Sequence, residues 1–310
     1  MAKYIFKRII GLFATLLVLS LVVFILMHSI PGGPFDLSGG DKGIALPDAV
    51  REEILKNAGL DKPLPQQYVT YVWNALHFDF GTSFYKPTMT VNEIIGQTWK
   101  VSIQLGLMTF IGASVVGILL GILSGFHQNT LIDYITSVIS VIGVVIPNFV
   151  VAIILVMVFS VMLHWLPTGG WNGPKTWIMP VIAYSLQPMS QIARYTRTSV
   201  IDVIGEDYIR TARAKGVTDR VMVFKHILRN ALIPILTVLG PILADVLTGS
   251  FYIESIFRIP GLGRYFTTSV NQRDYPMIMG TTLLVAALMA IVNLITDILY
   301  GIVDPRIRMQ

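Results

Sequence analysis

The sequence predicts an all-α integral membrane protein with six transmembrane helices and both termini on the cytoplasmic side (N-in/C-in). Three observations lead to this fold class. Hydrophobic residues make up 54% of the 310 residues and charged residues only 13%, whereas a soluble domain has about 25% charged residues. Six long apolar runs are each long enough to cross a bilayer. Finally, Lys and Arg are unevenly distributed between the segments that connect these runs.

The six apolar runs are predicted as membrane spans. The first follows Lys3, Lys7 and Arg8 as a secretory signal would, but its apolar stretch is too long for one. We therefore interpret it as an uncleaved transmembrane helix. The six spans cover Ile9–Ile30, Val101–Phe126, Tyr134–Leu163, Trp177–Arg197, Ala231–Ile253 and Met277–Val303.

The distribution of basic residues sets the orientation. With the N-terminus inside, thirteen Lys and Arg fall on the cytoplasmic side and ten outside, and five of those ten lie in one long loop to which the rule applies weakly. Eight of the thirteen lie in Arg194–Arg229. The net charge of +5 mostly reflects this asymmetry, so a nucleic-acid partner is not needed to explain it.

The long outside loop, Pro31–Trp99, carries helix signals of its own. An amphipathic run from Pro47 ends at Gly59, and a second run covers Gln66–Leu76. Thr90 and Glu93 have the spacing of a capping box for a third helix. We expect this loop to form a small helical cap outside the membrane.

Small residues follow one face of the second span. Gly117, Gly121 and Gly125 recur every fourth position, a spacing that lets helix backbones approach closely. Packing within the chain is favoured over a subunit interface. Pro147, Pro188, Pro234 and Pro241 lie in or at the ends of spans and permit kinks.

Asp245 is the one acidic residue well inside an apolar span. A carboxylate at the bilayer centre costs at least about 2.5–3.5 kcal/mol unless it is paired or faces water. Asp245 can therefore line or gate a path, or be a packed and hydrogen-bonded acid, and the sequence leaves both open. Asp133 and Asp297 lie near the cytoplasmic ends of spans, where a cap or a salt bridge is the simpler interpretation.

Several chemistries are excluded or lack a motif. There is no Cys, which excludes disulfides and thiolate chemistry. The five histidines have no metal-ligand spacing, and the phosphate-binding G-x-x-x-x-G-K-[ST] loop is absent. We predict no catalytic residue, no metal and no cofactor in this chain. Any ATP hydrolysis that drives it must occur on another polypeptide.

The segment between the fourth and fifth spans is the most informative. Acidic residues begin a short helical run, basic residues end it, and Gly216 follows as a C′ residue. The small side chains of Thr211, Ala212 and Ala214 allow another protein to approach the backbone. Tyr208 and Ile209 are expected to anchor that protein. The alternative is an amphipathic helix lying on anionic lipid.

This segment resembles the EAA loop of ABC-importer permeases, in the form found in the oligopeptide and dipeptide permeases. The similarity extends along nearly the whole chain. It runs through Ser29–Pro34, with a small departure at the first two positions, and through Gly59–Pro63, Asp79–Ser83, Ile146–Phe149, Trp165–Gly170, Gly249–Phe257, Pro260–Gly263, Arg273–Tyr275 and Asp304–Arg306. The set is most similar to the OppB type. The resemblance identifies 206–216 as a coupling helix that docks on an ATPase subunit. The coupling residues that it implies are Tyr208, Arg210, Thr211, Ala212, Arg213, Ala214, Lys215, Gly216, His226 and Arg229.

The resemblance also implies a type I (MetI-like) permease fold in the bacterial cytoplasmic (inner) membrane. Expected partners are a second permease subunit (OppC-like), two ATP-binding subunits (OppD- and OppF-like) that carry ATP and Mg²⁺, and an extracytoplasmic peptide-binding protein (OppA-like). The outside loop and Phe257–Arg273 are expected to receive that binding protein. The candidates for the pathway and gate are Asp245, Asn148, Glu254 and Phe257.

The predicted organisation has four parts: an N-terminal span (1–30), the outside helical loop (31–99), a five-helix core (100–303) with the coupling loop 198–230, and a tail (304–310). The predicted function is translocation of oligopeptides or dipeptides. Two alternatives stay open: a secondary transporter or channel that uses Asp245, or an ABC permease for another substrate such as nickel or glutathione.

Overall fold

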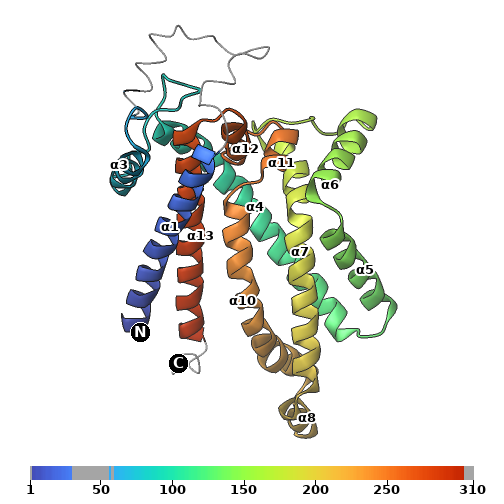
Figure 1. Ribbon diagram of the computed structural model, residues 1–310. Coiled ribbons are helices and arrows are strands. Elements are labelled where there is room, and N and C mark those ends of the chain that lie inside the picture. Colours follow the sequence, from blue (N-terminus) through green and yellow to red (C-terminus); the bar gives the residue numbers. More distant parts are fainter. Residues whose placement is uncertain (1, 30–55, 57–58, 304–310) are drawn as a thin grey trace. The chain divides into compact units, whose positions relative to one another are not determined.

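The computed structural model describes residues 2–29, 56 and 59–303 (Figure 1). The described residues form helices joined by short loops, and their β-structure is limited to an isolated bridge between Thr82 and Thr90. The predicted all-α class is confirmed. The helix predicted to run from Pro47 to Gly59 lies almost entirely outside the described residues.

Within the described residues, three helices are long and apolar enough to cross a membrane: Arg8–Ser29, Val91–Phe126 and Tyr275–Thr296. Two bent pairs raise the number to five if each pair is one span: Leu131–Val145 with Asn148–Met162, and Met222–Leu232 with Pro234–Leu247. The predicted fourth span lies within α7 (Pro174–Gly205), which is outside this set. Its polar residues, among them Gln187, Gln191 and Arg194, lower its hydropathy.

The chain forms two compact units. The first consists of Met1–Val101 and Gly261–Ala290. It contains α1 (Ala2–Ser29), α3 (Leu64–Leu76), the start of α4 (Val91–Phe126), α12 (Gly263–Asn271) and the start of α13 (Tyr275–Val303). One cluster in its core joins α4 to α13 and comprises Val91, Ile94, Ile95, Leu262 and Met277.

Two capping arrangements order this first unit. The predicted capping box is present: the Thr90 amide donates to the Glu93 carboxylate at 2.9 Å, and the Glu93 amide donates to the Thr90 hydroxyl at 3.2 Å. Asp274 precedes α13 and is 2% exposed. Its carboxylate accepts hydrogen bonds from the Ser83 hydroxyl and from the Phe84 amide at 3.1 Å. Asp274 thereby fixes the loop before α4 to the start of α13.

The second unit consists of Ser102–Pro260 and Ile291–Gln310. After the rest of α4 come α5 (Leu131–Val145), α6 (Asn148–Leu155), the π-helix η2 (Val156–Met162) and α7. Then follow α8 (Asp207–Ala214), α9 (Asp219–Val221), the π-helix η3 (Met222–Ile227), α10 (Leu228–Leu247) and α11 (Phe251–Ile256).

The glycine stripe of α4 packs against α7 inside this unit. A Cβ on Gly117 would lie 2.7 Å from the Met189 carbonyl oxygen, one on Gly121 2.6 Å from that of Ala193, and one on Gly125 2.7 Å from Val200. Such distances leave no room for a side chain. The stripe is therefore a packing surface within the chain, as predicted.

The prolines differ in what they do to the helices. The chain turns by 102° between α5 and α6, at Pro147, so the predicted third span is a sharply broken one. Around Pro234 the helix bends by 49°. In contrast, α7 continues as one helix through Pro180 and Pro188. A proline has no amide proton to donate to the preceding turn, and the helices bend to different degrees at these four prolines.

Candidate functional site: the coupling segment and the pathway residues

The predicted coupling helix is present as α8, slightly shorter than expected. After α7 ends at Gly205, Glu206 has φ −67° and ψ 143° and separates the two helices. Asp207 lies in the first turn of α8 and Arg213 in the last, which complements the helix dipole at both ends. Figure 1 shows α8 directly after the end of α7.

The C-terminus of α8 is closed by a Schellman motif. The Gly216 amide donates to the Arg213 carbonyl at 3.0 Å and the Val217 amide to the Ala212 carbonyl at 3.2 Å. This pattern requires a left-handed residue at C′, and Gly216 has φ +74°. The prediction that Gly216 is the C′ residue is confirmed.

Ile209 attaches α8 to its own chain. Its side chain is 1% exposed and packs with Val200, Met222, Ile227 and Ala231. The prediction that Ile209 anchors another protein was therefore wrong. Ile209 is the one fully buried side chain of α8, and its neighbours Tyr208 and Arg210 are exposed.

Apart from Ala212, the other side chains of α8 are exposed. Ala212 is half-buried and supports the apolar cluster around Ile209. Arg210 and Asp207 form an ion pair at 3.5 Å, but both side chains are largely exposed, and such pairs contribute little to stability. The exposed coupling candidates are Tyr208, Arg210, Thr211, Arg213, Ala214, Lys215 and Gly216.

Asn230 links α8 to the first turn of α10. Its side-chain amide donates to the Tyr208 hydroxyl at 2.8 Å and to the His226 carbonyl at 2.9 Å. His226 is half-buried in η3, and Arg229 is exposed on α10. The coupling candidates from the two sides of the loop are thus brought together through Asn230.

A second polar contact joins α10 to α7. The Ser199 hydroxyl donates to the Ala231 carbonyl at 2.8 Å, and both residues are buried. The Ile209 cluster includes Val200 of α7 and Ala231 of α10. The Ile209 cluster therefore connects α8 with both long helices.

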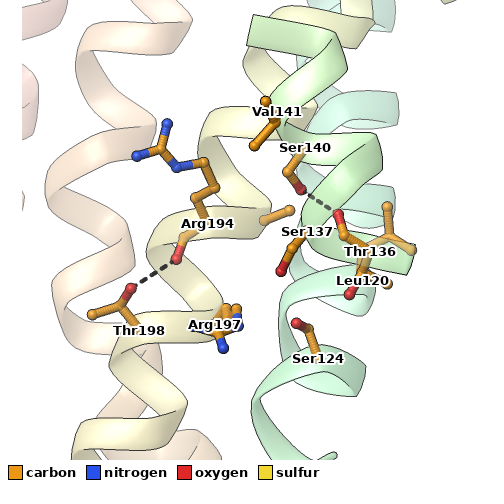
Figure 2. Close-up of a pocket in the computed structure, with 10 residues that line it drawn as sticks. Leu120, Ser124, Thr136, Ser137, Ser140, Val141, Arg194, Arg197 and Thr198 are labelled. Atoms are coloured by element: carbon orange, nitrogen blue, oxygen red, sulfur yellow. Dashed lines mark hydrogen bonds between the residues drawn. The ribbon is translucent and has the colours of Figure 1, made fainter. Parts of the chain in front are cut away.

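Asp133 on α5 forms a bidentate ion pair with Arg197 on α7. Its oxygens accept from Arg197 Nε at 2.6 Å and Nη2 at 2.8 Å, and the Ser124 hydroxyl adds a third bond at 2.5 Å. The predicted role of Asp133 in a salt bridge is confirmed. Beside this pair lies a cavity of about 260 Å³, with Ser137 on one side and Thr198 on the other (Figure 2).

Asp245 lies in the last turn of α10, whereas the sequence placed it well inside a longer span. The helix ends at Leu247 because Gly249 adopts φ +85° and the Thr248 amide turns back to the Asp245 carbonyl at 3.2 Å. The Asp245 side chain is exposed. No donor within hydrogen-bonding distance of its carboxylate is found among the described residues.

The other three pathway candidates occupy less exposed places. Glu254 is 0% exposed and accepts a hydrogen bond from the Ser102 hydroxyl at 2.7 Å. Phe257 is also 0% exposed, and its carbonyl accepts from the Gly170 amide at 2.7 Å. Asn148 is half-buried at the start of α6.

Two contacts of candidate site residues had no signal in the sequence. Ser102 and Glu254 are 152 positions apart, and Tyr208 and Asn230 are 22 apart. Only the polarity of Ser102 and Glu254 in otherwise apolar surroundings could have suggested a pairing, and the second pair lacks even that signal. In the part of the chain that the structure describes, no group of three or more His, Cys, Asp or Glu side chains is positioned for a metal ion.

Comparison with known families agrees with this geometry. Residues 117–309 match the family "Binding-protein-dependent transport system inner membrane component", and residues 1–100 match the N-terminal region of such membrane components. The first match contains α8, the loop to α10 and Asp245.

Similar proteins extend over the full length. The dipeptide transport system permease DppB of Bacillus subtilis is 42% identical over 310 residues, which cover 100% of this chain and 99% of that protein. The oligopeptide permease OppB of Salmonella typhimurium is 41% identical over 310 residues, 99% of this chain and 100% of that protein.

Solved structures agree at the level of the fold. The MetNI methionine ABC transporter in an inward-facing conformation is 16% identical, with a TM-score of 0.55 over 68% of this chain and 96% of that chain. An amino acid ABC transporter is 15% identical, with a TM-score of 0.54 over 68% and 94%. With its motifs, its fold and these full-length relatives, this chain belongs to the family of binding-protein-dependent transport system inner membrane components.

Proposed function

We propose that the chain is a permease subunit of an ATP-driven importer for dipeptides or oligopeptides, and that α8 docks on the ATP-binding subunit. The observation that carries this proposal is the arrangement of α8: one buried side chain, Ile209, holds it, while most of its surface is exposed. The relatives named above are dipeptide and oligopeptide permeases, which supports a peptide substrate.

The proposed topology has six transmembrane helices with both termini in the cytoplasm, so that α8 lies on the ATPase side. The proposed complex contains a second, OppC-like permease, two ATP-binding subunits of the OppD and OppF kind, and an external OppA-like binding protein. The chain binds no cofactor of its own, and ATP and Mg²⁺ bind to the partner subunits.

Coupling in this proposal is mechanical. Closure of the ATP-binding subunits displaces α8, and the contacts of Ile209 and Tyr208 carry the displacement to α7 and α10. The free energy comes from the different affinities of the partners for the two conformations. Asp245 lines the path, while Asn148, Glu254 and Phe257 shape its gate.

Reconstitution tests the function. The complete complex in proteoliposomes should take up peptide only with ATP and loaded binding protein, and a proton gradient alone should give none. Uptake by this chain with a proton gradient and without any ATPase would overturn the proposal in favour of a secondary transporter.

Cross-linking tests the docking of α8. The chain has no native Cys, so single cysteines report one position each. Ala214→Cys, on the exposed end of α8, should cross-link to an ATP-binding subunit that carries a matching cysteine. Val69→Cys is the control, because Val69 is 65% exposed but lies on α3 in the other unit. Equal yields from both positions would contradict docking through α8.

We also propose that the binding protein docks on the outside loop (31–99) and on Phe257–Arg273. The ordered helical elements of that loop, α3 and the capping box before α4, support this role. Deletion of Asp48–Leu60, most of which lies outside the described residues, should weaken docking. Unchanged docking affinity and uptake would leave the loop as a cap only.

A further inference from the structure

One exposed face of α10 carries three polar residues and a proline. Thr237, Pro241 and Asp245 follow one another at intervals of four, and Thr248 follows three residues later, which places them on one helix face. Thr237, Pro241 and Asp245 are exposed, and Thr248 is half-buried. We call these four residues the α10 stripe.

The charge of the stripe favours a cation. Asp245 lies in the last turn of α10, where the helix dipole presents its negative end and the final carbonyls lack amide donors. An unpaired carboxylate in such a place is more costly than one at a helix N-terminus. No protein donor reaches the Asp245 carboxylate among the described residues, so these residues leave its charge without a partner.

The remaining groups of the stripe accept hydrogen bonds and do not offer protons. The Thr237 hydroxyl donates to the Pro234 carbonyl, and the Thr248 hydroxyl donates to the Asp245 carbonyl at 2.6 Å. Both hydroxyl protons are thus used within the helix, so each hydroxyl oxygen can act only as an acceptor toward a ligand. Pro241 has no amide proton, which leaves the Thr237 carbonyl without its helical donor.

A ligand that fits this stripe must therefore supply both positive charge and several protons. An ammonium group does so, because it is a cation with three donors. We propose that the α10 stripe binds the α-ammonium group of the transported peptide, with Asp245 as its counter-ion. This inference rests on the proposed peptide import, since that substrate carries such a group.

The test uses the complete transporter in proteoliposomes with saturating, peptide-loaded binding protein. Asp245→Asn keeps the size of the side chain and removes its charge, and Asp245→Glu keeps the charge. Uptake is compared for a peptide with a free amino terminus and for its N-acetylated form, each at a measured saturation of the binding protein. Gln128→Ala is the control, because Gln128 is an exposed polar residue between α4 and α5, outside both the stripe and the coupling loop.

For the free peptide, Asp245→Asn should lower maximal uptake by about tenfold or more, as the loss of a charged hydrogen bond implies. The acetylated peptide should change by less than about twofold, and Asp245→Glu should restore most of the free-peptide uptake. The control variant should behave as wild type.

Three results would overturn the inference. Equal losses of uptake for both peptides would show that Asp245 affects transport without recognising the ammonium group of the substrate. Unchanged uptake of both peptides would exclude any role in transport. Loss of the second permease from the purified complex would show that Asp245 pairs with a basic residue of that subunit. If the wild-type complex shows no ATP-dependent uptake of either peptide, the proposed peptide import fails. That result differs from the three above, in which the wild-type complex does transport peptide.

Discussion

Asn230 donates its side-chain amide to the Tyr208 hydroxyl at 2.8 Å and so ties α8 to α10. The same amide donates to the His226 carbonyl at 2.9 Å, which fixes its orientation. Together with Ile209 on the buried side, this gives α8 one apolar and one polar attachment. With two attachments, a displacement of α8 is expected to displace α7 and α10 as well. With only one attachment, α8 could rotate about that contact without moving them.

Removing the polar attachment should uncouple ATP hydrolysis from transport. We expect Tyr208→Phe and Asn230→Ala each to reduce the stimulation of ATPase activity by loaded binding protein severalfold, because each removes a bond of about 0.5–1.5 kcal/mol. The double variant should be no worse than the more impaired single variant, because both changes remove one interaction. ATPase assays on the reconstituted complex measure this. Fully additive losses would show that the two residues act separately.

Removing the apolar attachment should release α8 from the chain. Ile209→Ala deletes a side chain that is 1% exposed, and such a change costs about 2–5 kcal/mol. Hydrogen exchange in Asp207–Val217 should rise strongly in purified protein, while exchange in α4 stays unchanged. Val221→Ala is the control, since Val221 is 44% exposed. Wild-type protection of α8 in the Ile209 variant would contradict the anchoring role.

Gly216 allows a test of backbone conformation alone. Its φ is +74°, and a Cβ built there meets no atom within 4 Å, so substitution causes conformational strain without a clash. Gly216→Val should cost at least about 1–2 kcal/mol and reduce coupled uptake, while Gly216→Asn should be milder. Gly205→Ala is the control, because Gly205 is also free of contacts but has no positive φ. Normal uptake and ATPase coupling in the valine variant would refute this reading of the cap.

The features that could be predicted from the sequence are those set by near neighbours. The capping box of Thr90 and Glu93, the C′ glycine of α8 and the four-residue spacing of the α4 glycines depend on residues within one or two helical turns. The glycine pattern also identified a close helix contact, although only the structure assigns α7 as the partner.

The features that could not be predicted depend on distant parts of the chain. Ile209 and Tyr208 are both large and adjacent, and only the position of Val200 and Ile227 decides which one is buried. Glu254 is paired with Ser102, from another helix. The early end of α10 did have a local signal in Gly249, but the apolar residues that follow it in α11 extended the predicted span.

The ion pair of Asp133 with Arg197 should stabilise the packing of α5 on α7. Asp133 is 3% exposed and receives two bonds from the guanidinium, and removing one partner of a buried pair costs about 3–5 kcal/mol. Because the Arg197 side chain is 31% exposed, water can compensate part of that cost, and we expect the destabilisation by Asp133→Asn to lie near the lower limit.

Thermal unfolding of the purified chain in detergent should show a lowered midpoint for Asp133→Asn, with Asp202→Asn as the control. Asp133→Leu combined with Arg197→Met should recover much of the loss, since both charges are then absent. An unchanged midpoint in Asp133→Asn would mean that the α5–α7 contact relies on its small residues, such as Gly143 against Ser190.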